Sequence, residues 1–229
     1  MSALVESTTK ASVIVQLVTG ALGIAGLTYT VPKEHAILMQ LLGLEMIVQV
    51  IELLFYFYFI SFFQLEGLAQ LRYFDWFIST PIMLFTMAAY FTYKNKDEQR
   101  NKEENKEGLS LRDFYTVNSN SLWTIFIANF GMLLFGYLGE IGSLNKLSAF
   151  TFGTGAFLVS FYTLYDKFAK FSQYSRILFS IMFVLWSGYG LGFLFSNVSK
   201  NIMFNGLDIL AKNFFGLFLT YQIQSLSPG

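Results

Sequence analysis

Long apolar stretches alternate with short polar connections along the whole chain. Seven of them are apolar enough to indicate membrane spans, and they cover about 11–31, 35–62, 70–92, 119–139, 147–165, 175–196 and 202–224. Each has room for the roughly 20 residues that a helix needs to cross a bilayer. Because lipid offers no hydrogen-bond partners, each segment must bond its own backbone, and a helix does so. The pattern predicts an all-α membrane protein, a bundle of seven transmembrane helices.

The composition agrees with this prediction and narrows the class of protein. Of the 229 residues, 54% are hydrophobic and 19% are aromatic, which is more than in an ordinary soluble chain. Seven spans use most of this length, so we expect one domain over residues 1–229. The chain has no Cys, which excludes disulfides and thiolate metal sites. Its formal net charge is zero, so no long-range attraction to nucleic acid is expected.

Basic residues predict the orientation of the bundle. One side of the predicted membrane has Lys33, Lys94, Lys96, Arg100, Lys102, Lys106, Arg112, Lys167, Lys170 and Arg176, and the other has Lys10, Lys146 and Lys200. The positive-inside rule then places the N-terminus outside and the C-terminus in the cytoplasm. The cytoplasmic connection at about 93–113 is almost entirely charged or amide over 94–107. We expect a solvated loop or a short surface extension of a helix there.

The last apolar segment carries two opposite charges. Asp208 and Lys212 are the ionisable side chains of residues 203–219, and a spacing of four places them on one face of a helix. A charge at mid-bilayer costs about 2.5–3.5 kcal/mol on insertion scales and marks a functional site by default. The alternative is a buried ion pair that only fixes helix packing.

The third segment contains a second polar cluster, in the stretch R-Y-F-D-W-F-I-S-T-P over residues 72–81. Arg72 and Asp75 share a helix face, and Ser79 and Thr80 add hydroxyls one turn later. The proline at the end of the stretch frees a backbone carbonyl. A proline-kinked helix with one snorkelling arginine is the alternative interpretation.

This stretch resembles the third-helix signature of microbial rhodopsins, R-Y-x-D-W-x-x-[ST]-T-P, at every specified position. The Asp-x-x-x-Lys spacing is also similar to that family's final helix. The resemblance implies all-trans retinal as the cofactor, linked to Lys212 on the seventh helix as a protonated Schiff base. It also implies Asp75 as the primary counterion, Asp208 as the second, and Arg72 as a switchable guanidinium beside them.

The resemblance implies a retinal pocket as well. The sequence W-S-G-Y at 186–189, with an aromatic residue four positions later, is similar to a pattern that covers the polyene and its ring end. The fourth segment aligns through Asn129 and two further residues, which without the family would be packing residues. The implied pocket residues are Trp76, Thr80, Met132, Gly136, Trp186, Tyr189 and Phe193.

Glutamates in the second segment bear on what such a protein transports. Outward proton pumps of the family carry a carboxylic donor eleven residues after the counterion, but that position is Thr86 here. The connection at 195–200 also lacks their outer release acids. Glu45 and Glu52, seven residues apart, lie within about 20° of one helix face. Together with Ser12, Ser79 and Asn205 they predict a hydrated ion pathway.

Three functions follow from these residues. Glutamates on the second helix are similar to those of channelrhodopsins and giant-virus rhodopsins, so we expect a light-gated cation channel. The first alternative is a light-driven outward proton pump with Glu45 as donor, and the second is a sensory rhodopsin that signals through 94–107. Each glutamate has a plainer alternative as a neutral core acid.

The expected partners are the lipid bilayer, monovalent cations or protons, and further copies of the chain in a homo-oligomer. Enzyme members of the family append soluble domains. We expect none here, and therefore no enzyme activity.

Overall fold

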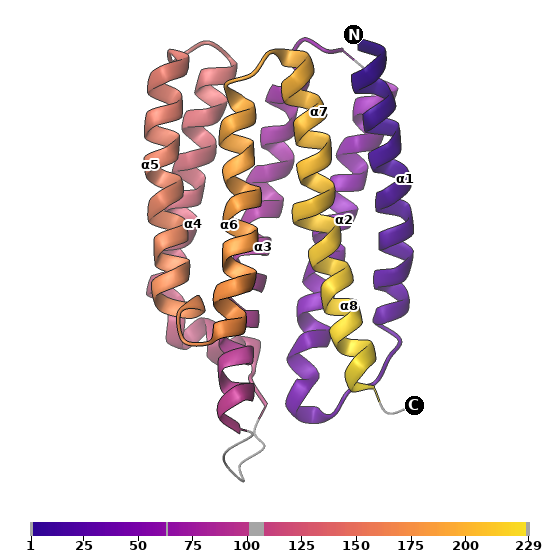
Figure 1. Cartoon of the computed structure of the whole chain (residues 1–229), viewed down its shortest axis with the longest axis vertical. Helices are drawn as coiled ribbons and strands as arrows, with labels where there is room; N and C mark the ends of the chain where they lie inside the picture. Colours follow the sequence, from indigo (N-terminus) through magenta and orange to yellow (C-terminus); the bar gives the residue numbers. More distant parts are fainter. Residues whose placement is uncertain (1, 63, 101–107, 228–229) are drawn as a thin grey trace.

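The computed structural model describes residues 2–62, 64–100 and 108–227, and it is a bundle of upright helices (Figure 1). The elements in chain order are α1 (Ser2–Gly26), the 3₁₀ turn η1 (Lys33–His35), α2 (Ala36–Ser61), α3 (Leu68–Arg100), α4 (Leu111–Glu140), α5 (Lys146–Leu164), the π turn η2 (Tyr165–Ala169), α6 (Gln173–Phe193), α7 (Asn197–Asp208), the π turn η3 (Ile209–Asn213) and α8 (Phe214–Leu226). Because α7, η3 and α8 form one span, seven helices of the described chain are long and apolar enough to cross a membrane. The predicted fold class is confirmed.

Several helix ends lie outside the predicted ranges. The first helix begins at Ser2 and ends at Gly26, whereas 11–31 was predicted. The fourth begins at Leu111 rather than near 119, because the Ser110 side chain caps it by accepting from the Asp113 N–H. Hydropathy locates only the lipid-embedded part of a helix, and polar turns that continue it into water leave no apolar signal.

The charged stretch after the third span is partly helical. Residues 94–100 continue α3, which is one of the two expected alternatives, while 101–107 lie outside the described residues. The extension packs on the α5–α6 connection, where Asn95 Nδ2 donates to the Phe168 carbonyl at 2.8 Å. There Ser172 Oγ also donates to Glu98 Oε1 at 2.7 Å.

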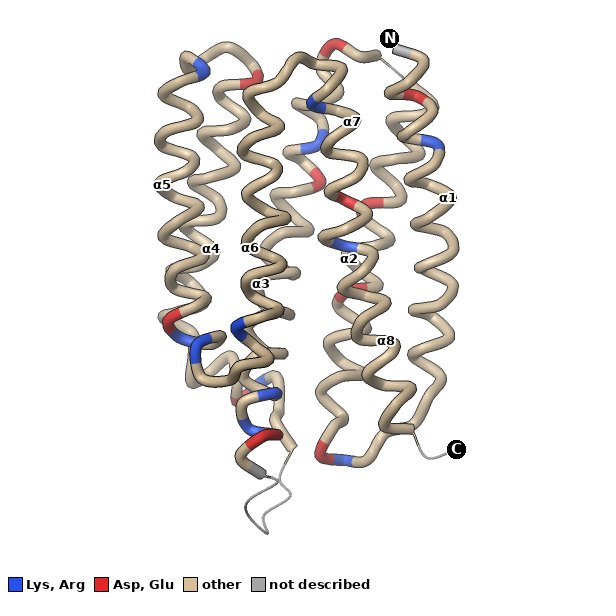
Figure 2. The backbone as a smooth tube through the Cα atoms, in the orientation of Figure 1, with Lys and Arg blue, Asp and Glu red and all other residues tan. Residues whose placement is uncertain are grey.

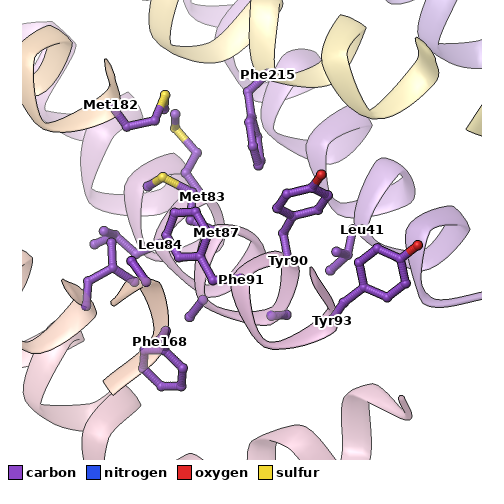
Figure 3. Packing of buried hydrophobic residues seen from close by; sticks show 14 of the residues in the cluster. Leu41, Met83, Leu84, Met87, Tyr90, Phe91, Tyr93, Phe168, Met182 and Phe215 are labelled. Atoms are coloured by element: carbon purple, nitrogen blue, oxygen red, sulfur yellow. The ribbon is translucent and has the colours of Figure 1, made fainter. Parts of the chain in front are cut away.

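The two halves of the bundle differ in what they bury. The half toward the C-terminus is filled by large apolar side chains such as Leu41, Met87, Phe91 and Phe215 (Figure 3). The half toward the N-terminus and the middle bury charged and amide groups instead, among them Arg72. The outer faces of the helices expose large aliphatic residues, as expected for a surface in lipid. Most of the buried charged groups therefore lie in this part of the interior.

Candidate functional site

The predicted functional lysine lies in the π turn η3, inside the seventh span. Charged residues occur on α3 and on the seventh span well away from the ends of the bundle (Figure 2). Lys212 Nζ donates to Asp75 Oδ2 at 2.6 Å and lies 4.0 Å from Asp208 Oδ1. All three side chains are at most 3% exposed. The stronger contact is thus to the α3 carboxylate, and not to the residue four positions earlier. π turns inside α-helices are frequent at functional sites.

Arg72 binds the other carboxylate. Its Nη1 donates to Asp208 Oδ2 at 2.9 Å and to the Tyr56 hydroxyl at 3.0 Å. Its Nε donates to Asn201 Oδ1 at 3.2 Å, and its Nη2 donates to Asn205 Oδ1. The guanidinium is 1% exposed, and it is held by groups from α2 and α7. A buried cation with this many acceptors is compensated rather than isolated.

The two carboxylates therefore have different surroundings. Asp208 also accepts hydrogen bonds from the Tyr56 hydroxyl at 2.7 Å and the Tyr189 hydroxyl at 2.8 Å. Asp75 accepts only from Lys212, and its Oδ1 has no hydrogen-bond partner within the described residues. Asp208 is fixed in place by its donors, whereas Asp75 has an oxygen that can still accept a proton.

An apolar cavity of about 330 Å³ begins at Lys212. All the predicted pocket residues line it, namely Trp76, Thr80, Met132, Gly136, Trp186, Tyr189 and Phe193. The fifth helix adds residues for which the sequence had no motif, namely Ala149, Phe150, Gly153, Thr154, Phe157 and Leu158. This size and this mainly apolar lining with a few polar groups are typical of a small-molecule site.

Two small groups shape one wall of the cavity. Asn129 Nδ2 donates to Thr80 Oγ1 at 2.8 Å, which fixes the hydroxyl that was predicted to lie there. At Gly136 a Cβ atom would lie 2.6 Å from the Tyr73 hydroxyl oxygen. A larger residue at this position would push the tyrosine ring, which also lines the cavity.

The predicted ion pathway begins beside the Arg72 cluster. Asn205 Nδ2 donates to Thr8 Oγ1 at 2.8 Å and to Thr9 Oγ1 at 3.1 Å. Ser12 Oγ donates to the Asn205 carbonyl at 3.4 Å. The predicted first span, 11–31, put Ser12 at the start of the helix, which is wrong, since α1 begins at Ser2 and places this serine more than two turns inside.

These buried polar side chains form a polar seam, which continues past Lys212. Gln16 Nε2 donates to Glu52 Oε1 at 3.3 Å. Gln49 Nε2 donates to Thr19 Oγ1 at 2.5 Å and to Asn213 Oδ1 at 3.0 Å. Glu52 lies within electrostatic reach of the lysine and both aspartates. Buried polar groups from α1, α2 and the seventh span thus meet along one interface.

Glu45 and Ser79 are buried in different settings. Glu45 is 2% exposed, and neither carboxyl oxygen has a hydrogen-bond partner in the part of the chain that is described. Thr86 of α3 interacts with it across the helix interface. Ser79 is fully buried one turn after Asp75, and its hydroxyl also has no partner among the described side chains. These two predicted pathway residues lie in the interior, outside the hydrogen-bonded seam.

Comparison with known proteins identifies the family. A family model described as bacteriorhodopsin-like protein matches residues 7–226. The chain belongs to this family of microbial rhodopsins. None of the curated proteins compared with it matches.

Solved rhodopsin structures share the fold. A viral rhodopsin, OLPVRII, is 25% identical with a TM-score of 0.80, over 98% of this chain and 100% of that one. A blue light-absorbing proteorhodopsin from Med12 is 19% identical with a TM-score of 0.72, over 96% and 97% of the chains. A light-driven proton pump from Leptosphaeria maculans is 17% identical with a TM-score of 0.71, over 97% of each chain. This chain is therefore a microbial rhodopsin that is similar to a viral member of the family.

Membership in the rhodopsin family implies a retinal chromophore, and the cavity fits one. Of the residues that line it, Lys212 alone carries a primary amine, the group that an aldehyde requires. The walls are apolar enough for a polyene, and two carboxylates offset one cation at the amine end. Lys212 would hold retinal, while Asp75 and Asp208 would stabilise the positive charge.

Residues missed by the sequence analysis complete the rhodopsin site. Tyr56 follows Glu52 by one turn on the same helix face. Asn201 precedes Asn205 by four positions, and with Asp208 and Lys212 it forms a polar stripe at helical spacing. That spacing was available in the sequence and could have identified Asn201.

Proposed function

We propose that this microbial rhodopsin is a light-gated cation channel with all-trans retinal on Lys212. The supporting observation is the polar seam between α1, α2 and the seventh span, which passes directly beside the lysine. On α1 it is formed by Thr9, Ser12, Gln16 and Thr19, which recur at helical spacing and are all buried. Carboxylates in such a lining attract cations and repel anions.

The seam is closed at two places in this structure. Toward the C-terminal end it meets an apolar layer that includes Leu38, Leu41, Leu42 and Leu219, each of which is completely buried. A dry constriction of this kind blocks ions by excluding water. Toward the N-terminal end the Arg72 guanidinium places a positive charge beside the route, which repels cations. This arrangement describes a channel closed in the dark.

The residues around the lysine couple light to these barriers. When bound, retinal supplies light absorption and an isomerisation that displaces the cation at the Lys212 nitrogen. Asp75 would then lose its single hydrogen-bond donor and take up, at a carboxyl oxygen, the proton that the Lys212 nitrogen gives up. The loss of that negative charge changes the field on Arg72, which is bonded to Asp208 and the seam asparagines. A shift of Arg72 admits water from the N-terminal side.

The orientation and scope of the protein are part of this proposal. The N-terminal end faces outside and the C-terminal end faces the cytoplasm, as the basic residues predict. Residues 1–229 act as one domain that moves ions and catalyses no reaction on a substrate. An epitope fused after Gly229 should be accessible only in permeabilised cells, and labelling of intact cells would contradict this orientation.

Voltage-clamp recording of the retinal-loaded protein tests the channel. The photocurrent should reverse near the cation equilibrium potential and shift when external sodium or potassium is changed. Glu52→Gln should change ion selectivity several-fold without bleaching the pigment, because it removes a carboxylate from the lining. The matched control is Glu6→Gln, an exposed glutamate near the start of α1, which should leave the current unchanged. Outward current that does not reverse within about ±100 mV, roughly 2.3 kcal/mol per charge, would contradict the channel.

The contacts of Glu45 favour one alternative, an outward proton pump. In pumps the donor stands at the position of Thr86, and here Glu45 approaches that threonine from the opposite helix. Glu45 on α2 could therefore donate a proton at the place where pumps have a donor on α3. A buried carboxyl with no fixed partner is suited to release a proton.

Flash spectroscopy of Glu45→Gln tests this alternative. If Glu45 is a proton donor, recovery of the dark pigment slows about 10²–10⁴-fold, the range of a general acid, and added azide restores it. Thr86→Val provides the control, because it removes the neighbouring hydroxyl and keeps the carboxyl group. Recovery at the normal rate in Glu45→Gln would leave the glutamate as a core or pathway residue.

A further inference from the structure

A second buried ion pair lies outside the lysine cluster, which consists of Arg72, Asp75, Asp208 and Lys212. Lys200 Nζ is 2.5 Å from Glu140 Oε1, and the two side chains are 4% and 8% exposed. Glu140 is the last residue of α4, and Lys200 is in the first turn of α7. Gln70 Nε2 of α3 also donates to the Glu140 carbonyl at 3.2 Å. Neither the channel nor the pump mechanism uses this pair.

The pair lies directly behind the wall of the cavity. Phe193 lines the cavity, and Lys200 Nζ is 5.4 Å from its ring centroid. On another side the ring is packed tightly on α4, since a Cβ atom at Gly139 would lie 2.8 Å from its Cζ. Glu140 interacts electrostatically with Tyr73, another lining residue. The Lys200 ammonium thus lies against one lining ring, and the Glu140 carboxylate acts electrostatically on another.

A third charge near this wall differs in its exposure. Lys146 Nζ lies 5.8 Å from the Phe193 ring centroid, almost as close as Lys200. Lys146 is exposed, however, and donates to the Leu194 carbonyl at 3.0 Å. Water and salt screen an exposed charge much more than a buried one. The field inside the cavity therefore depends on the buried pair.

We propose that the Glu140–Lys200 ion pair sets the absorption maximum by balancing charge behind Phe193 and Tyr73. The absorbing species carries its positive charge at the Lys212 nitrogen in the ground state, and light moves this charge along the polyene. An unpaired cation beyond the far wall opposes that movement and raises the excitation energy. An unpaired anion there lowers the excitation energy. While the pair is intact, the two effects cancel except for a small remainder, whose sign is that of the charge closer to Phe193.

This proposal rests on retinal occupying the cavity and is independent of whether the protein is a channel or a pump. A failed current measurement therefore leaves it intact, and an absorption result leaves the channel test intact.

Absorption spectra of two single variants test the balance. Lys200→Met leaves the carboxylate unpaired, so its maximum should move to longer wavelength, on the order of 10 nm. Glu140→Gln leaves the ammonium unpaired, so its maximum should move to shorter wavelength by a similar amount. Spectra in a pH series extending to alkaline values ensure that the unpaired carboxylate is ionised. Lys200→Arg keeps the charge and should keep the maximum.

Matched controls separate charge from packing. Lys146→Met removes the exposed lysine at the same ring and should shift the maximum by less than about 3 nm. The neutral double variant Glu140→Gln with Lys200→Met should absorb close to the wild type. Shifts of both single variants in the same direction, or an equal shift in Lys146→Met, would overturn the proposal.

A charge-swapped variant keeps the test decisive if a single variant fails to fold. Glu140→Lys combined with Lys200→Glu retains an ion pair and places the anion behind Phe193. Its maximum should move to longer wavelength, while the melting temperature of the retinal-free protein stays near that of the wild type. A folded swap variant with a maximum unchanged or at shorter wavelength would contradict the proposed role.

Discussion

Lys212→Ala protein is expected to be colourless after incubation with retinal and to give no photocurrent. The lysine is the amine of the cavity lining, and its nitrogen is paired with the buried Asp75 carboxylate. Removing the amine removes covalent attachment, so visible absorption should be lost completely rather than reduced. The measurement is an absorption spectrum before and after borohydride treatment.

Lys200→Gln is the matched control for this result. Lys200 and Lys212 are the two buried lysines within residues 2–62, 64–100 and 108–227. A general effect of removing a buried ammonium group should therefore occur in both variants, but only Lys212→Ala should lose the pigment. A borohydride-reducible linkage that survives in Lys212→Ala would show that another group binds retinal.

The seven spans could be predicted because hydropathy measures burial in lipid, which is what determines them. Their ends depend on other interactions. α4 begins at a serine cap, and α3 continues into water through a mixed-charge segment without an apolar stripe. The π turn at Ile209–Asn213 has no sequence signal of its own. It depends on packing and on the contact between Lys212 and the third helix.

The composition of the lysine cluster was predictable, but its pairing was not. Spacing placed Arg72 beside Asp75 on one helix and Asp208 beside Lys212 on another. The structure instead pairs charges across helices, Lys212 with Asp75 and Arg72 with Asp208. This choice depends on the rotation of α3 against the seventh span, which no spacing within a single helix specifies.

The polar seam shows a related limit. Glu45, Glu52 and Asn205 stood out because carboxylates and amides are rare in apolar segments. Ser12 was predicted with them, but the threonines and the glutamine of α1 are less conspicuous, and only their contacts with α2 and the seventh span give them a role. Lys200 was placed in the connection at 195–200 and Glu140 was given no role, and their burial became evident only when α4 and α7 were seen together.

Because Lys212 pairs with Asp75 and Arg72 pairs with Asp208, neutralising either aspartate should have a different effect. Asp208 is the only carboxylate that forms a salt bridge with Arg72 among the described residues. Asp208→Asn leaves a buried guanidinium with neutral acceptors alone, and breaking such a pair costs about 3–5 kcal/mol. The free energy of unfolding of the retinal-free protein should fall by that amount, with lower expression as a consequence.

Asp75→Asn should instead act mainly on colour. Lys212 keeps Asp208 at 4.0 Å, so the loss of stability should stay well below that of Asp208→Asn. The cation at the lysine nitrogen loses its closest anion, which held the positive charge at that end of the chromophore. Less energy is then needed to move the charge along the polyene, and the absorption band should move to longer wavelength. Thermal melts of the two retinal-free variants, with spectra of the loaded forms, separate these effects. Equal losses of stability in the two variants would mean that both carboxylates serve one shared ion-pair network, and not two separate roles.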